Sequence, residues 1–330
     1  MHTYRLGDAG PEIRDIQQRL AALGLHIDAD ELEGRFGPST DVAVRGFQAG
    51  RSLRVDGLVG PDTWHHLVEA GWSLGDRTLY LRQPIFRGDD VRALQRRLNA
   101  LGFDAGREDG FLGPQTDGAL REFQRNVGRE PDGIVGPDTL AAFDRLRPSL
   151  DSPSRAVVRE AESLRGLHAG LAGAVVAIDP AGGDDDESFA VAAMLADELG
   201  RLGAKPAVLR GADEALTASD RARAANEVGA AACVSIHVDR DRATSGPVCF
   251  SFGNTSTHSP MGMRLAQLIV EELALEFGTV GTTERLAATM LRETRMPAVQ
   301  VEPAVHGEVD ATRIARAIAT GLARFFAPQP

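Results

Sequence analysis

Lysine and cysteine are nearly absent from this chain of 330 residues, and no long apolar run occurs in it. Lys205 is the only lysine, and the two cysteines are Cys233 and Cys249. A disulfide between neighbouring strands is conceivable, but two buried free thiols are the expected state in a reducing compartment. No stretch reaches the roughly 20 apolar residues of a membrane span, and residues 1–15 lack the apolar core of a signal peptide. We therefore expect a cytoplasmic protein without a membrane span.

An excess of basic residues is also missing. The formal net charge is −11, which argues against nucleic acid and anionic membrane surfaces as partners, because their binders carry clusters of Lys and Arg. Hydrophobic residues make up 43% of the chain and charged residues 25%, as in ordinary globular proteins. The length predicts two or three domains, each large enough to bury a core.

An internal repeat fills the first half of the chain. The segment IQQRLAALGL at residues 16–25 returns as LQRRLNALGF at residues 94–103. Likewise DGLVGPDT at residues 56–63 returns as DGIVGPDT at residues 132–139. The apolar spacing predicts amphipathic helices, Gly-Pro pairs mark helix starts, and Asp-Gly pairs mark turns. Two three-helix bundles follow, and we expect residues 79–88 to be a linker between them.

The fixed Gly, Pro, Asp and Thr positions of both copies resemble the bacterial peptidoglycan-binding helical module. The resemblance implies peptidoglycan or its precursors as ligand. These shared residues mostly form turns and helix starts, so they do not indicate which residues bind the ligand. A Pro- and Ser-containing joint follows, and from residue 173 strands alternate with helices, which predicts an α/β sheet covered on both faces.

Three predicted strands of this second half end in polar groups, at AVVAIDPAGGDDDE, ACVSIHVD and AVQVEPA. Catalytic groups gather at the carboxyl ends of strands in such sheets, so the three ends suggest one site. The pattern, with the later LRETRMPAVQVE, resembles the zinc-dependent N-acetylmuramoyl-L-alanine amidases over about residues 173–326. These enzymes cleave the bond between the glycan strand and the peptide stem of peptidoglycan.

The resemblance implies which residues would form the zinc site. His237 matches a ligand, and Glu302 matches the carboxylate that acts as general base. The resemblance also implies a ligand Glu at the start of the helix that follows the first strand of this domain. The apolar spacing of that helix aligns the ligand position with Ser188, and Glu187 lies one residue before it. The family's first ligand, the His of DPGHGG, is missing near Ala181, because the chain reads DPAGG. The sequence therefore predicts no bound cofactor.

Zinc is expected only if another side chain replaces the missing ligand. Carboxylates of the acidic loop or histidines of other loops are the candidates, namely Asp184, Asp185, Asp186, His258 and His306.

The whole arrangement resembles the actinobacterial CwlM type, a group of amidase-like proteins understood as cytoplasmic regulators of peptidoglycan precursor synthesis. We expect a peptidoglycan-binding module at residues 1–72, a second at 73–146, a linker at 147–172 and an amidase-like domain at 173–330. A pseudo-amidase regulator is the favoured hypothesis, with proteins of cell-wall synthesis as further partners. The alternatives are an active zinc amidase of cell-wall turnover and a protein-interaction scaffold that binds no sugar.

Overall fold

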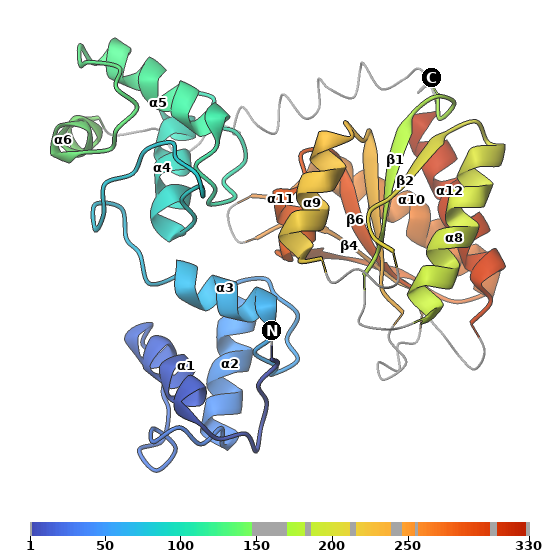
Figure 1. Ribbon diagram of the computed structural model, residues 1–330, viewed down its shortest axis with the longest axis horizontal. Helices are drawn as coiled ribbons and strands as arrows, with labels where there is room; N and C mark the ends of the chain where they lie inside the picture. Colours follow the sequence, from blue (N-terminus) through green and yellow to red (C-terminus); the bar gives the residue numbers. More distant parts are fainter. Residues whose placement is uncertain are drawn as a thin grey trace. The chain divides into compact units, whose positions relative to one another are not determined.

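The computed structural model describes residues 2–146, 170–181, 186–211, 216–238, 246–254, 257–303 and 309–327, without the side chain of Asp186 (Figure 1). These residues fall into two compact units. One unit carries helices α1 to α6, and the other carries a six-stranded sheet with its helices. None of the helices described is both long enough and apolar enough to span a bilayer.

The first unit consists of two three-helix modules, as the repeat predicts. Module 1 contains α1 (Pro11–Ala22), α2 (Pro38–Gly50) and α3 (Pro61–Glu69). Module 2 contains α4 (Asp89–Ala100), α5 (Pro114–Asn126) and α6 (Pro137–Arg145). Proline opens five of the six helices, where its missing N–H costs no intrahelical bond. The apolar stripes of α4, α5 and α6 face one another in a single core.

A glutamine from the preceding helix fixes each of four loops. In the second loop, the side-chain oxygen of Gln48 accepts the N–H of Gly57 at 2.9 Å. Its amide donates to the carbonyl of Leu58 and to the hydroxyl of Thr63. Each module is therefore built from two copies of one smaller helix–loop unit. The glutamines with the same role in the other three loops are Gln17, Gln95 and Gln124.

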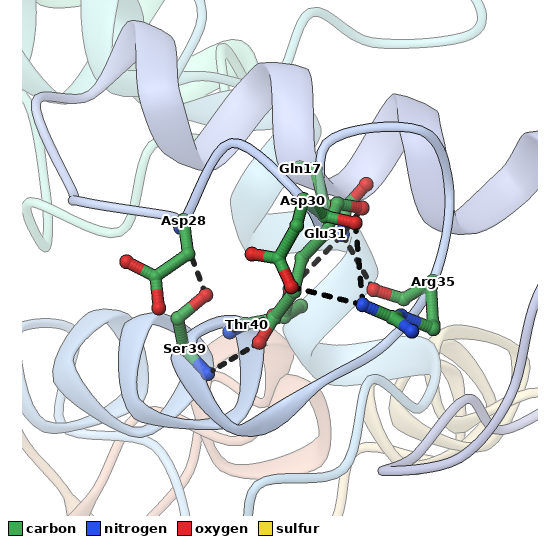
Figure 2. Close-up of polar contacts among 7 residues, drawn as sticks. All are labelled: Gln17, Asp28, Asp30, Glu31, Arg35, Ser39 and Thr40. Atoms are coloured by element: carbon green, nitrogen blue, oxygen red, sulfur yellow. Dashed lines mark hydrogen bonds and ion pairs between the residues drawn. The ribbon is translucent and has the colours of Figure 1, made fainter.

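The first loop adds a buried carboxylate, shown in Figure 2. Glu31 accepts the backbone N–H groups of Ser39 and Thr40 at 3.0 and 2.8 Å, and the Thr40 hydroxyl at 2.7 Å. It thereby satisfies donors in the first turn of α2, where no residue of the helix itself provides a side-chain cap. Burial alone would raise the pKa of Glu31, but these hydrogen bonds outweigh it and lower the pKa from 4.5 to about 2.

Residues 79–88 are not a linker, contrary to the sequence prediction. Leu79 pairs with Val135, and Arg87 pairs with Phe111. The same two bridges occur in module 1, between Tyr4 and Val59 and between Ala9 and Arg35. The segment therefore belongs to module 2. Three additional residues between the bridges shift the alignment of the two copies, which conceals this part of the repeat.

The second unit is built on one mixed sheet with the strand order β2-β1-β3-β6-β4-β5. All neighbouring strands are parallel except β4, which runs antiparallel to β6. The strands are β1 (Val175–Pro180), β2 (Lys205–Val208), β3 (Ala232–Ile236), β4 (Val248–Phe252), β5 (Thr282–Leu286) and β6 (Ala298–Glu302).

Helices cover both faces of this sheet, as predicted (Figure 1). One layer contains α8 (Asp186–Arg201), α10 (Pro260–Phe277) and α12 (Ala311–Phe326). The other contains α9 (Ala218–Glu227) and α11 (Thr289–Glu293). Strand β5 and helix α11 were not predicted from the sequence. The segment TTERL is polar and largely exposed, and five residues are too few to show a helical period.

The two cysteines lie on opposite faces of the sheet. Cys233 on β3 packs into the layer of α9 and α11, while Cys249 on β4 packs into the other layer, and β6 separates their strands. Both are buried free thiols, which confirms the expected state and rules out a bond between them in this fold. Burial raises the pKa of both thiols, so neither is a ready nucleophile.

Candidate functional site

The candidate site lies at the carboxyl edge of three adjacent strands. The N–H of Ala181, just after β1, donates to the carbonyl of Ile236 at 2.8 Å. The N–H of His237, just after β3, donates to the carbonyl of Val301 at 2.9 Å. The last residue of β6 is Glu302. The structure therefore brings Ala181, His237 and Glu302 to one edge, in the order of their strands.

His237 and Glu302 form the centre of this edge. Nδ1 of His237 lies 3.7 Å from Oε1 of Glu302, and the glutamate side chain is only 4% exposed, against 28% for the histidine. The amide of Gln300 donates to the same carboxylate oxygen at 3.0 Å. Sequence reasoning missed Gln300, although the period of two along a strand puts it on the same face as Glu302.

A buried ion pair lies just before the ends of the strands that form this edge. Asp179 is fully buried on β1, and its carboxylate accepts Nε of Arg221 on α9 at 2.7 Å. The hydroxyl of Ser235 on β3 donates to the other oxygen at 2.8 Å. Arg210, which follows β2, donates to the carbonyl of Pro180 at 2.9 Å. These contacts connect β1, β2, β3 and α9 next to the strand ends that form the site.

Ser188 occupies the helix position that faces this edge. Its side chain is buried on the same face of α8 as Val191 and Leu195, at spacings of three and seven residues. The Ser188 hydroxyl accepts the N–H of Val238 at 3.1 Å, next to His237. Glu187 is one position earlier, about 100° around the helix, and is partly exposed. The position that faces the sheet therefore carries a neutral hydroxyl.

His258 does not approach the site, contrary to the expectation that it could replace a ligand. Because β4 is antiparallel to β6, its first residue Val248 pairs with Glu302, and its last residue Phe252 lies at the opposite edge of the sheet. His258 pairs with Gly253 at that opposite edge. Three other candidates, Asp184, Asp185 and His306, lie outside the described residues, as does the side chain of Asp186.

The described residues of the edge do not fit a catalytic zinc ion. Such an ion needs three protein ligands and one open position. Ala181 has only a methyl group, and the Ser188 hydroxyl is engaged with Val238, so Ala181, Ser188, His237 and Glu302 together offer one imidazole and one carboxylate. Across the part of the chain that the structure describes, no three His, Cys, Asp or Glu side chains form a group suited to a metal ion.

Comparison with known families identifies both halves of the chain. Residues 9–67 and 87–143 match the family described as "Putative peptidoglycan binding domain". Residues 172–322 match the family described as "N-acetylmuramoyl-L-alanine amidase", whose members are typically zinc-dependent. The order of the matches agrees with the two helical modules and the α/β unit.

Individual relatives match either nearly the whole chain or part of it. The "N-acetylmuramoyl-L-alanine amidase CwlM" of Mycobacterium tuberculosis is 34% identical over 96% of this chain and 87% of the relative. The "N-acetylmuramoyl-L-alanine amidase CwlL" of Bacillus licheniformis is 32% identical over 42% of this chain and 44% of the relative. The crystal structure of the amidase Ami1 from Mycobacterium smegmatis aligns with 48% of this chain and 99% of its own, at 21% identity and a TM-score of 0.42.

The relationship to CwlM extends over nearly the whole chain at 34% identity, so it covers the modules as well as the sheet. This chain therefore belongs to the N-acetylmuramoyl-L-alanine amidase family and carries two peptidoglycan-binding modules ahead of its amidase-like domain.

Proposed function

We propose that this amidase-family chain is a pseudo-amidase, which binds peptidoglycan or its precursors and does not cleave the muramoyl–L-alanine bond. Its modules hold the ligand, and its amidase-like domain contributes a cleft without zinc chemistry. Such a protein acts as a regulator of peptidoglycan synthesis, and its other partners are proteins of cell-wall synthesis.

The hydrogen bond between Ser188 and Val238 supports this proposal most strongly. The family resemblance implies a ligand carboxylate at this helix position, whereas the serine hydroxyl accepts a backbone N–H next to His237. Zinc affinity depends on a preorganised ligand set, so losing an imidazole at Ala181 and a carboxylate at Ser188 removes most of it. Glu302 then has no metal-bound water to deprotonate.

An active amidase is the second candidate, and the pairing of His237 with Glu302 favours it. One family ligand and the general base are both present and adjacent. Activity would then require a replacement ligand from the acidic loop that precedes Glu187.

Purified peptidoglycan separates the two candidates in one experiment. The full chain is incubated with it, the bound protein is measured by co-sedimentation, and released stem peptides are measured by mass spectrometry. We expect binding without release, and the same result for Glu302→Gln. Release that Glu302→Gln abolishes would establish the active enzyme, and absence of binding would refute the proposed ligand.

A further inference from the structure

An exposed surface of aromatic and arginine side chains lies between α3 and α4. The segment that carries it joins α3, the last helix of module 1, to α4, the first helix of module 2 (Figure 1). We call this surface the ledge, and its residues are Trp72, Arg77, Tyr80, Leu81, Arg82 and Phe86.

Arg77 fixes the ledge to module 2. Its guanidinium donates to both carboxylate oxygens of Asp90, at 2.7 and 3.1 Å, and Asp90 is fully buried. The same guanidinium lies 4.5 Å from the ring centre of Trp72 and 4.8 Å from that of Phe86. A planar cation in contact with two rings is a stable arrangement, so Arg77 holds the ledge in place without a ligand.

Three side chains of the ledge are exposed to solvent, whereas Phe86 is buried. Trp72, Tyr80 and Leu81 are 39, 41 and 38% exposed. The chain has only two tryptophans and two tyrosines, and one of each lies here. Exposed Trp and Tyr are enriched at binding surfaces, because they bury a large area at little conformational cost.

Arg82 gives the ledge a positive charge. Its guanidinium lies 3.9 Å from the ring centre of Phe86, and within the described part of the chain it forms no ion pair. Arg77, by contrast, is neutralised by Asp90. In a chain with a net charge of −11, an exposed arginine that contacts the same Phe86 ring as the exposed Tyr80 fits a ligand that has both apolar faces and carboxylates.

The ledge lies outside the parts of the modules that match the peptidoglycan-binding family. It falls between the matched segments 9–67 and 87–143. Between the two β-bridges, module 1 has three fewer residues than module 2.

We propose that the ledge binds the glycopeptide unit of peptidoglycan. The sugar rings pack their apolar faces on Trp72 and Tyr80, and a carboxylate of the peptide stem pairs with Arg82. This inference rests on the peptidoglycan binding of the proposed function, and it names the surface that provides that binding.

Tryptophan fluorescence tests the position of the ligand in the full chain. The variant Trp64→Phe retains Trp72 as its only tryptophan, and Trp72→Phe retains Trp64, which lies in α3 outside the ledge. The probe is a disaccharide–tetrapeptide released from peptidoglycan. We expect a saturable change in emission with Trp64→Phe and a much smaller one with Trp72→Phe.

Affinity measurements with surface variants complete the test. Trp72→Ala, Tyr80→Ala and Arg82→Gln should each weaken binding of the disaccharide–tetrapeptide at least fivefold. Leu6→Ala is the control, because Leu6 is the exposed counterpart of Leu81 in module 1. Circular dichroism should show that all variants remain folded.

The possible failures are distinguishable. If the unmodified chain binds neither this probe nor peptidoglycan, the proposed function and this inference fall together. If the unmodified chain binds, but Trp72 emission is constant and the ledge variants bind normally, only the ledge is refuted. The ledge would then be available to a protein partner.

Discussion

The side-chain oxygen of Gln124 accepts the backbone N–H of Gly133 at 2.9 Å, across the last loop of module 2. The amide of Gln124 also donates to the carbonyl of Ile134. Gln124→Ala leaves the N–H of Gly133 without its partner, while the carbonyl of Ile134 keeps only the hydroxyl of Thr139 as a donor. We expect a loss of about 2–3 kcal/mol in the free energy of unfolding, measured by urea denaturation of the full chain.

Gln115→Ala is the matched control for this prediction. Gln115 belongs to the same module, but it is exposed and donates only to Asp104 at the surface. Its replacement should change stability by less than about 0.5 kcal/mol. Equal effects of the two variants would show that the glutamine does not fix the loop.

A glycine is required at position 133 by both the backbone angle and the neighbouring side chains. Its φ is +73°, and a β-carbon there would lie 2.4 Å from Oδ1 of Asp117. Gly133→Ala should cost at least about 1 kcal/mol. Gly118→Ala, at an open position of α5, should instead stabilise module 2 by roughly 0.5–1 kcal/mol. Thermal unfolding of the two variants should shift in opposite directions, and a common direction would contradict the assignment.

Glu31 makes the stability of module 1 dependent on pH. Its pKa is about 2 when folded, below its ordinary value of 4.5, so its contribution is complete above pH 4.5 and is lost as pH falls toward 2. Glu31→Gln should therefore cost on the order of 2–3 kcal/mol at pH 7 and progressively less from about pH 5 to pH 2. Urea denaturation followed by tryptophan emission measures this difference, because Trp64 lies in module 1. A difference that is constant with pH would refute the role of the carboxylate.

The sequence predicts the two modules well because the same pattern of residues occurs in both copies of the repeat. The Gly-Pro helix starts, the Asp-Gly turns and the apolar stripes are all local signals. The role of the four glutamines was not predicted, because each reaches a glycine nine or more residues away along the chain. The bridges of module 2 were not predicted either, because three extra residues between Leu79 and Arg87 shift the alignment of the two copies.

The candidate site was only partly predictable. Strand ends pointed to His237 and Glu302, since parallel strands deliver their carboxyl ends to one edge. The direction of β4 decides that His258 is remote from them, and nothing local in the sequence specifies that direction. Arg221 and Ser235 were not predicted either, because their contacts with Asp179 span 42 and 56 residues.

Arg221 should be important for the stability of the sheet unit. Arg221→Ala removes the ion-pair partner of the buried Asp179 carboxylate, and we expect a loss of about 3 kcal/mol. Arg223→Ala is the control on the same helix, because Arg223 is largely exposed and pairs with Asp220 and Glu227 at the surface. That variant should change stability by less than about 0.5 kcal/mol. Similar midpoints of urea denaturation for both variants would contradict the structural role of the Asp179–Arg221 pair.

The zinc content of the purified full chain tests the pseudo-amidase account most directly. The chain is equilibrated with zinc, desalted and analysed by inductively coupled plasma mass spectrometry, beside His237→Ala and a variant with Gly-His in place of Ala181 together with Ser188→Glu. We predict well under one zinc per chain for the unmodified protein and for His237→Ala, and a higher content for the variant that restores both ligands. One zinc per chain in the unmodified protein, lost on His237→Ala, would contradict the account.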